Sequence, residues 1–197
     1  MRVDSMDRSK WVVPRSAALQ SKSFSSLIRP VLDCTGVIVH GHYVGIAFAE
    51  PHVIKGSDWS CELVVAVLEK LTQSGLDLRS FDLRLHADNC TKELKNNSLC
   101  RLLGLLVARG RVRRASLECL QTGHSHEDVD QFFSLLGTFL QTQTEVHSPT
   151  EFMVAVRQYL SNPSVRPQEK IREVLKLDRV RAWLLDDVIQ FLVTQHF

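Results

Sequence analysis

Ionisable side chains gather in the segment 123–140, where they precede a run of apolar residues. The first eight residues of this segment contain two histidines, one glutamate and two aspartates: His124, His126, Glu127, Asp128 and Asp130. Carboxylate oxygens suit Mg²⁺ and Mn²⁺, and imidazole nitrogens bind other divalent metals. The segment is therefore a candidate metal site. The alternative is the polar first turn of an ordinary helix, because acids there complement the helix dipole.

The apolar residues that follow recur at helical spacing and indicate which acids border the core. The expected buried stripe consists of Val129, Phe132, Phe133, Leu136 and Leu140. At about 100° per residue, His126 and Asp130 lie together on one flank of this stripe, whereas Glu127 points to solvent. Ser125 and Asp128 have the spacing of a capping box, which accounts for Asp128 without a metal. Glu127 and Asp128 remain reserve ligands.

A second candidate acid stands at the end of a predicted strand. Residues 81–89 alternate between apolar and polar side chains, which places Asp88 on the polar side near the carboxyl end of the strand. Ligands of open α/β sheets gather at that end of the strands. The alternative is turn chemistry, because Asp88 followed by Asn89 is a common way to leave a strand.

The beginning of the chain carries Asp4, Asp7 and Lys10 at intervals of three residues. A short helical turn would bring all three side chains to one side. The alternative is a mobile polar terminus. Another hypothesis concerns zinc, since Cys119, His124 and His126 follow one another closely, but their spacing matches no common zinc site and no fourth ligand is evident.

Charges nearly cancel over the whole chain, with 24 Lys and Arg against 22 Asp and Glu. Any binding of a polyanion therefore has to be local. The clearest basic cluster is the segment between a predicted helix and a predicted strand that contains Arg109, Arg111, Arg113 and Arg114. These arginines are candidates for contacts with phosphates, and the alternative is a solvated loop.

Size and composition favour one domain with a small appendage. The chain has 197 residues, of which 44% are hydrophobic, enough for one core. Its five cysteines are odd in number and include no C-x-x-C pair, which argues against a disulfide framework. No apolar run reaches the roughly 20 residues that span a bilayer. We expect an intracellular protein, nuclear or cytoplasmic, with no membrane partner.

The periodicity predicts an α/β protein in which strands alternate with helices. An extended segment at residues 2–4 opens the series. The following elements are two strands within 27–49, a helix at 57–75, a strand at 81–89, a helix at 98–109, a strand at 115–120 and a helix from about 125. Helices are also expected at 150–160 and 168–197. Antiparallel strands first and helix-linked strands afterwards indicate a mixed sheet.

Several of these residues together resemble a domain family of unknown function from eukaryotes that looks like a transposase of the ribonuclease H-like, acid-triad class. The ordered series is Asp4, Asp7, Lys10, Pro14 and Arg15, then His40 and Gly41, then Asp88, Asn89, Glu93, Lys95 and Asn96, and finally the segment from Gly123 to Phe133. The resemblance covers residues 1 to about 160.

The resemblance implies a ribonuclease H-like mixed sheet, with strands 1–3 antiparallel, helices on both faces and acids on strand 1, after strand 4 and at the helix after strand 5. By motif these acids are Asp4, with Asp7 as substitute, Asp88 and Asp130. They would hold Mg²⁺ or Mn²⁺ for phosphoryl transfer on nucleic acid, with DNA favoured. His124 and Lys95, together with Lys10, Arg111, Arg113 and Arg114, would contact the nucleic acid.

The resemblance also sets the expected boundaries. The ribonuclease H-like domain would cover residues 1–145, with a truncated first strand, and a small helical extension would cover 146–197. Because only three residues precede Asp4, we expect a fragment or decayed copy with impaired activity. The alternative function is a catalytically inactive scaffold that binds nucleic acid or protein.

Overall fold

The computed structural model describes residues 1–6, 12–13, 15–16, 32–49, 53, 55–87, 97–119, 128–142 and 145–177, and it divides the chain into two compact units. The first unit comprises Met1–Val53 with Gly123–Asp178, and the second comprises Ile54–Thr122 with Arg179–Phe197. In the described part of the chain, no helix is both long and apolar enough to cross a membrane.

The first unit contains a mixed sheet. Its strands are β1 (Arg2–Ser5), β3 (Asp33–Val39), β4 (Tyr43–Ala49) and β8 (Ile171–Lys176), hydrogen-bonded in the order β1-β3-β4-β8. The pairs β1–β3 and β3–β4 are antiparallel, whereas β8 runs parallel to β4. The predicted extended segment near the N-terminus and the predicted pair of strands within 27–49 are therefore confirmed, and so is their antiparallel arrangement.

The hairpin between β3 and β4 turns at residues 40–42. Gly41 adopts a positive φ of 74°, which glycine reaches without the steric cost that a side chain imposes. The turn is closed by the backbone N–H of His42, which donates to the carbonyl of Val39 at 2.9 Å. The sequence placed two strands here but left the position of the turn open, and the turn carries His40 and Gly41 to one end of the sheet.

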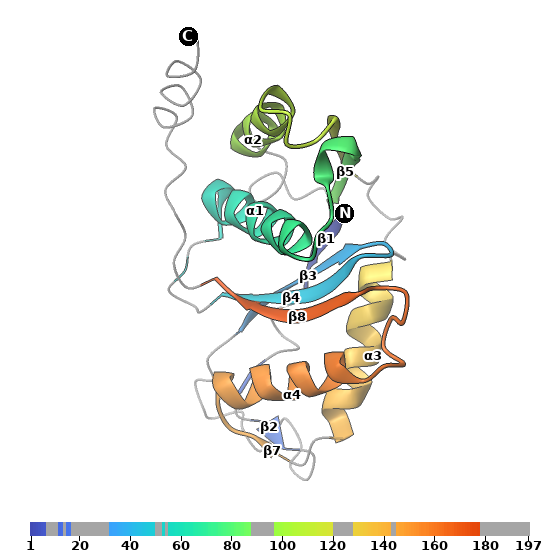
Figure 1. Ribbon diagram of the computed structural model, residues 1–197. Coiled ribbons are helices and arrows are strands. Elements are labelled where there is room, and N and C mark those ends of the chain that lie inside the picture. Colours follow the sequence, from blue (N-terminus) through green and yellow to red (C-terminus); the bar gives the residue numbers. More distant parts are fainter. Residues whose placement is uncertain are drawn as a thin grey trace. The chain divides into compact units, whose positions relative to one another are not determined.

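Two helices, α3 (Asp128–Thr142) and α4 (Pro149–Ser161), lie on the same side of β4 and β8 (Figure 1). The α3 residues that the periodicity predicted to be buried are all buried: Val129, Phe132, Phe133, Leu136 and Leu140. They pack in one core with Ile38, Val44, Ile46 and Phe48 of the sheet and with Phe152 of α4. A second, two-stranded sheet pairs β2 (Arg15–Ser16) antiparallel with β7 (Glu145–Val146).

The prediction of a helix over residues 168–197 is wrong for residues 171–176, which form β8. Parallel pairing with β4 gives this segment a ladder of backbone hydrogen bonds, and Ile171 and Val174 are β-branched residues that suit a strand. A short apolar segment carries too few turns for its period to separate helix from strand. The 145/146 boundary stays a prediction, and α4 and β8 both belong to the first unit.

The described part of the second unit contains two α-helices, one 3-10 helix and two parallel strands. Its elements are α1 (Ser57–Gln73), the 3-10 helix η3 (Leu78–Ser80), β5 (Asp82–Ala87), α2 (Asn97–Ala108) and β6 (Arg114–Cys119). In the parallel register Asp82 lies opposite Arg114 and Leu85 opposite Leu117. The predicted helices and strands of this part are confirmed, and positive φ angles at Gly75 and Gly110 follow the two helix ends.

Helix α2 is less buried than its composition predicted. The sequence is apolar nearly all round, but only Leu99, Leu102 and Leu103 are buried. The side chain of Val107 is 37% exposed. The helix contacts α1 and β6, so one stripe of it is covered, and its remaining apolar residues are half-buried or exposed.

Candidate functional site

Asp4 of β1 lies on the face of the sheet that packs against helix α3. Asp4 pairs directly with Gly36 of β3, and residues that face each other across an antiparallel pair project from the same face of the sheet. A Cβ atom added to Gly36 would lie 2.8 Å from atoms of both Phe133 and Val129 of α3. Asp4 therefore lies on the face of the sheet that α3 covers.

Arg2 and His40 bind the carboxylate at the beginning of α3. The Nη1 atom of Arg2 lies 3.3 Å from Oδ2 of Asp128, and Nε2 of His40 lies 3.4 Å from the same oxygen. The three side chains are 30%, 50% and 41% exposed for Arg2, His40 and Asp128. Asp128, predicted as a capping partner and reserve metal ligand, is therefore engaged by two basic side chains from β1 and the hairpin turn.

A second arginine, Arg166, lies close enough to this cluster to act on the charge of His40. Arg166, in the loop between α4 and β8, pairs through Nη2 with Oε1 of Glu169 at 3.0 Å, and the Glu169 side chain is fully buried. Arg166 has a φ of 44°, an uncommon backbone conformation for a residue with a side chain. A buried carboxylate requires a partner, which Arg166 supplies. No sequence pattern indicates this pair, because neither residue belongs to a periodic segment.

The pKa of His40 lies below its usual value. Burial is the largest cause, and the positive charges of Arg2 and Arg166 act in the same direction, while the Asp128 carboxylate opposes them. Because the folded state disfavours the protonated imidazole, this contribution to stability is present above the ordinary histidine pKa and decreases as the pH falls below it.

Replacing Asp128 by Asn is expected to lower the pKa of His40 further, because the substitution removes the one carboxylate that raises it. The Arg2→Gln substitution should have the opposite effect. Titration of the His40 imidazole by NMR measures both changes. Equal His40 pKa values in the wild-type chain and the Asp128→Asn variant would show that these two groups do not interact in solution.

Asp130 lies in the first turn of α3 and is half-buried. It shares this helix with the residues that pack against the Asp4 face of the sheet. The short helical turn that would have brought Asp4, Asp7 and Lys10 to one side does not include Asp4, because residues 2–5 form β1, in line with the predicted extended segment. Backbone pairing with β3 over the whole of β1 outweighs the local spacing of charges.

Seven predicted site residues lie outside the described part of the chain: Asp7, Lys10, Asp88, Lys95, His124, His126 and Glu127. The side chain of Cys119 is also outside it. The predicted convergence of Asp88 with Asp130, and the zinc hypothesis, therefore remain predictions. Among the described residues, no group of three His, Cys, Asp or Glu side chains is arranged to hold a metal ion.

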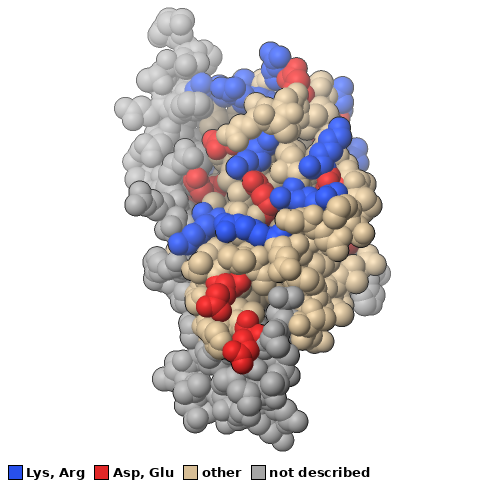
Figure 2. All heavy atoms as spheres, turned by 60° about the horizontal axis from the view of Figure 1, so that its bottom comes forward, with Lys and Arg blue, Asp and Glu red and all other residues tan. Residues whose placement is uncertain are grey.

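Three of the predicted basic residues of the second unit are at the surface. Arg111, Arg113 and Arg114 are all exposed. Arg113 forms two hydrogen bonds with Asp82, at 2.8 Å from Nε and 3.0 Å from Nη2. On the face shown in Figure 2, basic side chains are interrupted by acidic ones and form no continuous basic field.

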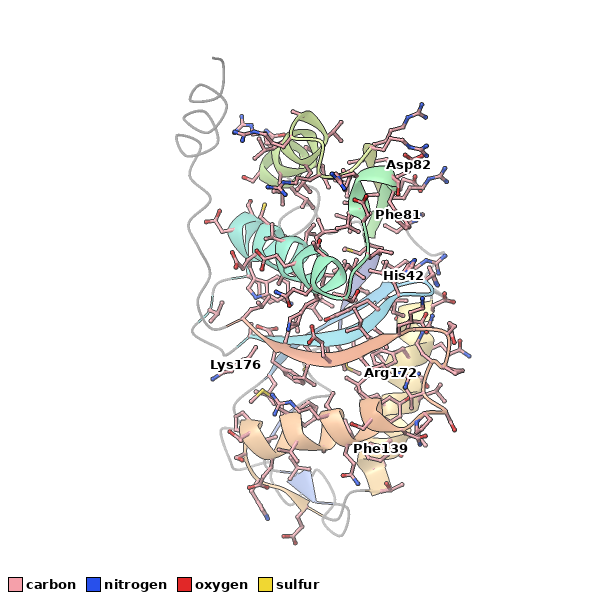
Figure 3. All side chains as sticks on the ribbon, viewed as in Figure 1. His42, Phe81, Asp82, Phe139, Arg172 and Lys176 are labelled. Atoms are coloured by element: carbon pink, nitrogen blue, oxygen red, sulfur yellow. The ribbon has the colours of Figure 1, made fainter. Side chains whose placement is uncertain are left out.

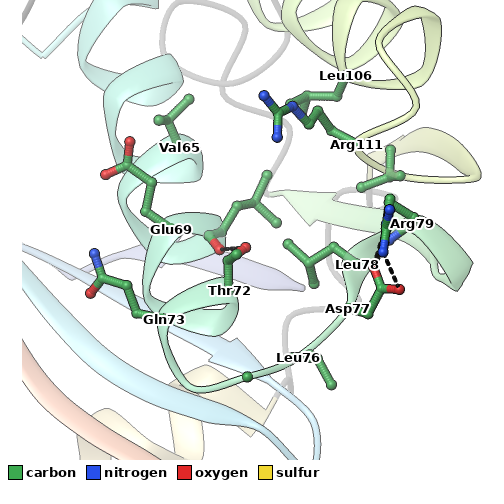
Figure 4. Close-up of a pocket in the computed structure, with 13 residues that line it drawn as sticks. Val65, Glu69, Thr72, Gln73, Leu76, Asp77, Leu78, Arg79, Leu106 and Arg111 are labelled. Atoms are coloured by element: carbon green, nitrogen blue, oxygen red, sulfur yellow. Dashed lines mark hydrogen bonds and ion pairs between the residues drawn. The ribbon is translucent and has the colours of Figure 1, made fainter.

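An open pocket of about 960 Å³ lies in the second unit, between the end of α1, the segment 75–79 and the end of α2 (Figure 4). Leucine side chains line much of it, and Arg79 at its rim is paired with Asp77 at 2.8 Å. Arg111 is the predicted site residue that contributes to its lining. The residues that line the pocket are therefore different from those of the cluster of Arg2, His40 and Asp128 in the first unit.

These observations define an α/β protein with a mixed sheet of antiparallel and parallel strands and four described helices. The model of the family described as "Domain of unknown function (DUF7869)" matches residues 24–196, so the chain belongs to this family. The prediction of membership in a domain family of unknown function is confirmed. No curated protein and no solved structure matches the chain significantly.

Proposed function

We propose that this chain is a transposase-derived domain with a ribonuclease H-like fold, and that Asp4, Asp88 and Asp130 serve metal-dependent phosphoryl transfer on nucleic acid, with DNA as the favoured substrate. The observation that carries the proposal is the position of Asp4 on the face of β1 that α3 covers. Asp130 lies on that same helix. Two acids from distant parts of the sequence thus stand on elements that pack together.

The order of the elements also supports the proposal. Three antiparallel strands are followed by helix, strand, helix, strand and helix, which is the order that the resemblance to ribonuclease H-like transposases implies. β5 ends at Ala87, directly before Asp88, and ligands of α/β sheets gather where strands end. The strand β8, which pairs with β4, is not part of the order that the resemblance implies.

The chemistry of the donors fits Mg²⁺ or Mn²⁺, because Asp4, Asp88 and Asp130 supply hard carboxylate oxygens. Such a metal ion would stabilise negative charge on the oxygens of the reacting phosphate. Glu127, Asp128 and His126 are the reserve ligands, although Asp128 already has two basic partners. Lys10, Lys95, His124 and the arginines at 111, 113 and 114 would contact phosphates. Nucleic acid as substrate implies an intracellular location, nuclear or cytoplasmic.

A catalytically inactive nucleic-acid or protein scaffold is the second candidate function. The observation that favours it is the pairing of Asp128 with Arg2 and His40, because a carboxylate held by two basic groups is a poor metal ligand. In such a protein the fold would persist while the acids had lost their metal-binding role.

Incubation of the purified chain with end-labelled DNA separates the two functions. The proposed activity predicts cleavage or strand transfer with Mg²⁺ or Mn²⁺, and none when EDTA is present. DNA binding without cleavage in any of these conditions would favour the scaffold. Zinc content of the purified chain, measured by metal analysis, tests the zinc hypothesis in the same preparation.

A further inference from the structure

Three arginines surround one carboxylate on the β5–β6 ribbon. Asp82 is the first residue of β5, and Figure 3 labels it next to Phe81. The guanidinium of Arg113 donates two hydrogen bonds to the carboxylate of Asp82, at 2.8 and 3.0 Å. Arg114 is the direct partner of Asp82 in the parallel register, and Arg84 follows Asp82 by two residues on the same face of β5. One negative charge thus lies among three positive ones.

Arginines outnumber acids in the described residues next to Asp82 along the chain. Within residues 77–87 and 109–119 there are six arginines, against the three acids Asp77, Asp82 and Glu118. Glu118 lies 3.1 Å from His86, and Asp77 is paired with Arg79. The Arg113 side chain is 62% exposed and that of Asp82 is 31% exposed. An anion from solution can therefore reach the arginines around Asp82.

The carboxylate of Asp82 is itself an oxyanion that these arginines bind. Hydrogen bonds from Arg113 are the main reason that the Asp82 pKa lies below its usual value, and the charges of Arg113, Arg114 and Arg84 add to the effect. Two parallel N–H donors of a guanidinium match a carboxylate and a phosphate equally well. In the unbound chain the carboxylate of Asp82 thus occupies the place that suits a phosphate oxygen.

We propose that Arg84, Arg113 and Arg114 bind phosphates of a nucleic-acid backbone and that Asp82 competes with those phosphates as an internal anion. We call these four residues the arginine cradle. Arg109 and Arg111 precede the cradle in the same segment and extend its positive charge, which suits a repeating phosphate chain better than a single phosphate ion. The inference rests on the proposed nucleic-acid partner but requires no metal ion.

If Asp82 competes with phosphates, removing its charge should increase the affinity of the chain for DNA. The Asp82→Asn variant is expected to bind a labelled 20-base-pair DNA about three-fold more tightly at low salt, since one repelling charge is lost and Arg113 is released. The matched control is Asp77→Asn, which removes the same charge from another exposed Asp–Arg pair of this unit. That control should leave the affinity nearly unchanged.

The converse variant removes two arginines of the cradle. Arg84→Gln with Arg114→Gln should weaken binding and reduce the slope of log affinity against log salt by about 1.8, because each phosphate contact contributes about 0.9 on duplex DNA. Arg157→Gln with Lys170→Gln removes the same charge from exposed positions of the first unit and serves as the control. Inorganic phosphate and heparin, added as competitors, distinguish a nucleic-acid site from a general anion site.

Fluorescence anisotropy in EDTA measures all of these affinities without cleavage. The cradle is supported if Asp82→Asn tightens binding, the double arginine variant weakens it and both controls match the wild-type chain. Absence of DNA binding by the wild-type chain, weaker binding by Asp82→Asn, equal effects in the control variants, or complete displacement by millimolar phosphate would overturn it. Cradle-dependent binding without Mg²⁺-dependent cleavage would instead contradict only the proposed catalytic function.

Discussion

Replacing Asp130 by Ala is expected to reduce Mg²⁺-dependent cleavage of DNA by at least about 100-fold, and Asp88→Ala should have the same effect. Loss of a residue that merely orients a metal ligand already costs about 10- to 100-fold, so loss of a direct ligand should cost more. Asp4→Asn tests the third acid, which lies on the face of β1 that α3 covers.

Two comparisons make this result specific. Asp128→Asn should reduce cleavage less than Asp130→Ala does, because Arg2 and His40 already engage the Asp128 carboxylate. Glu145→Gln removes an exposed acid from the first unit whose partner is His147, and it should leave cleavage unchanged. Initial rates on end-labelled DNA, with circular dichroism as a check of folding, provide the measurement. Equal activity in the wild-type chain and the Asp88, Asp130 and Asp4 variants would contradict the assignment.

The second large effect is expected at Gly36, where β3 packs closely against α3. Gly36→Ala should destabilise the chain by about 1–3 kcal/mol, the usual cost of inserting a methyl group into a filled core. The added Cβ would lie 2.8 Å from the Cζ atom of Phe133 and the Cγ1 atom of Val129, so α3 would have to move away from β1 and β3. Because α3 carries Asp130, cleavage should also fall.

Gly137 of α3 offers a matched control with the opposite sign. A Cβ at Gly137 would meet nothing within 4 Å, and alanine in place of glycine stabilises a helix interior by up to about 1 kcal/mol. Urea unfolding of Gly36→Ala, Gly137→Ala and the wild-type chain measures both changes. A Gly36→Ala variant as stable as the wild-type chain would show that β3 and α3 are not packed this closely in solution.

The sequence predicted most elements, because their patterns are long or bounded by clear end signals. The buried stripe of α3 repeats over several turns, and all five of its predicted members are buried. The strand at β5 followed from alternation, with Leu83 and Leu85 now buried. By contrast, β8 depends on pairing with β4, a partner more than 120 residues earlier, and local periodicity contains no information about such a partner.

The contacts within the candidate site were harder to predict from the sequence than the helices and strands. The acidic segment around Asp128 and Asp130 stood out by composition, but composition could not show that Arg2 and His40 converge on Asp128. The three residues lie far apart in the chain, and only the antiparallel register of β1 with β3 brings the first two together. For Asp82, the exposed arginines were visible as a cluster, whereas its position opposite Arg114 follows from the parallel register.

Anomalous diffraction from crystals grown with Mn²⁺ is the most direct test of whether distant acids jointly bind a divalent ion. We predict at least one Mn²⁺ peak with oxygens of both Asp88 and Asp130 at roughly 2.0–2.6 Å, the range of carboxylate ligands to hard cations, and with Asp4 on the same side. Carboxylates of Asp88 and Asp130 on opposite faces of the sheet, or a basic lining where the ion should bind, would contradict the account.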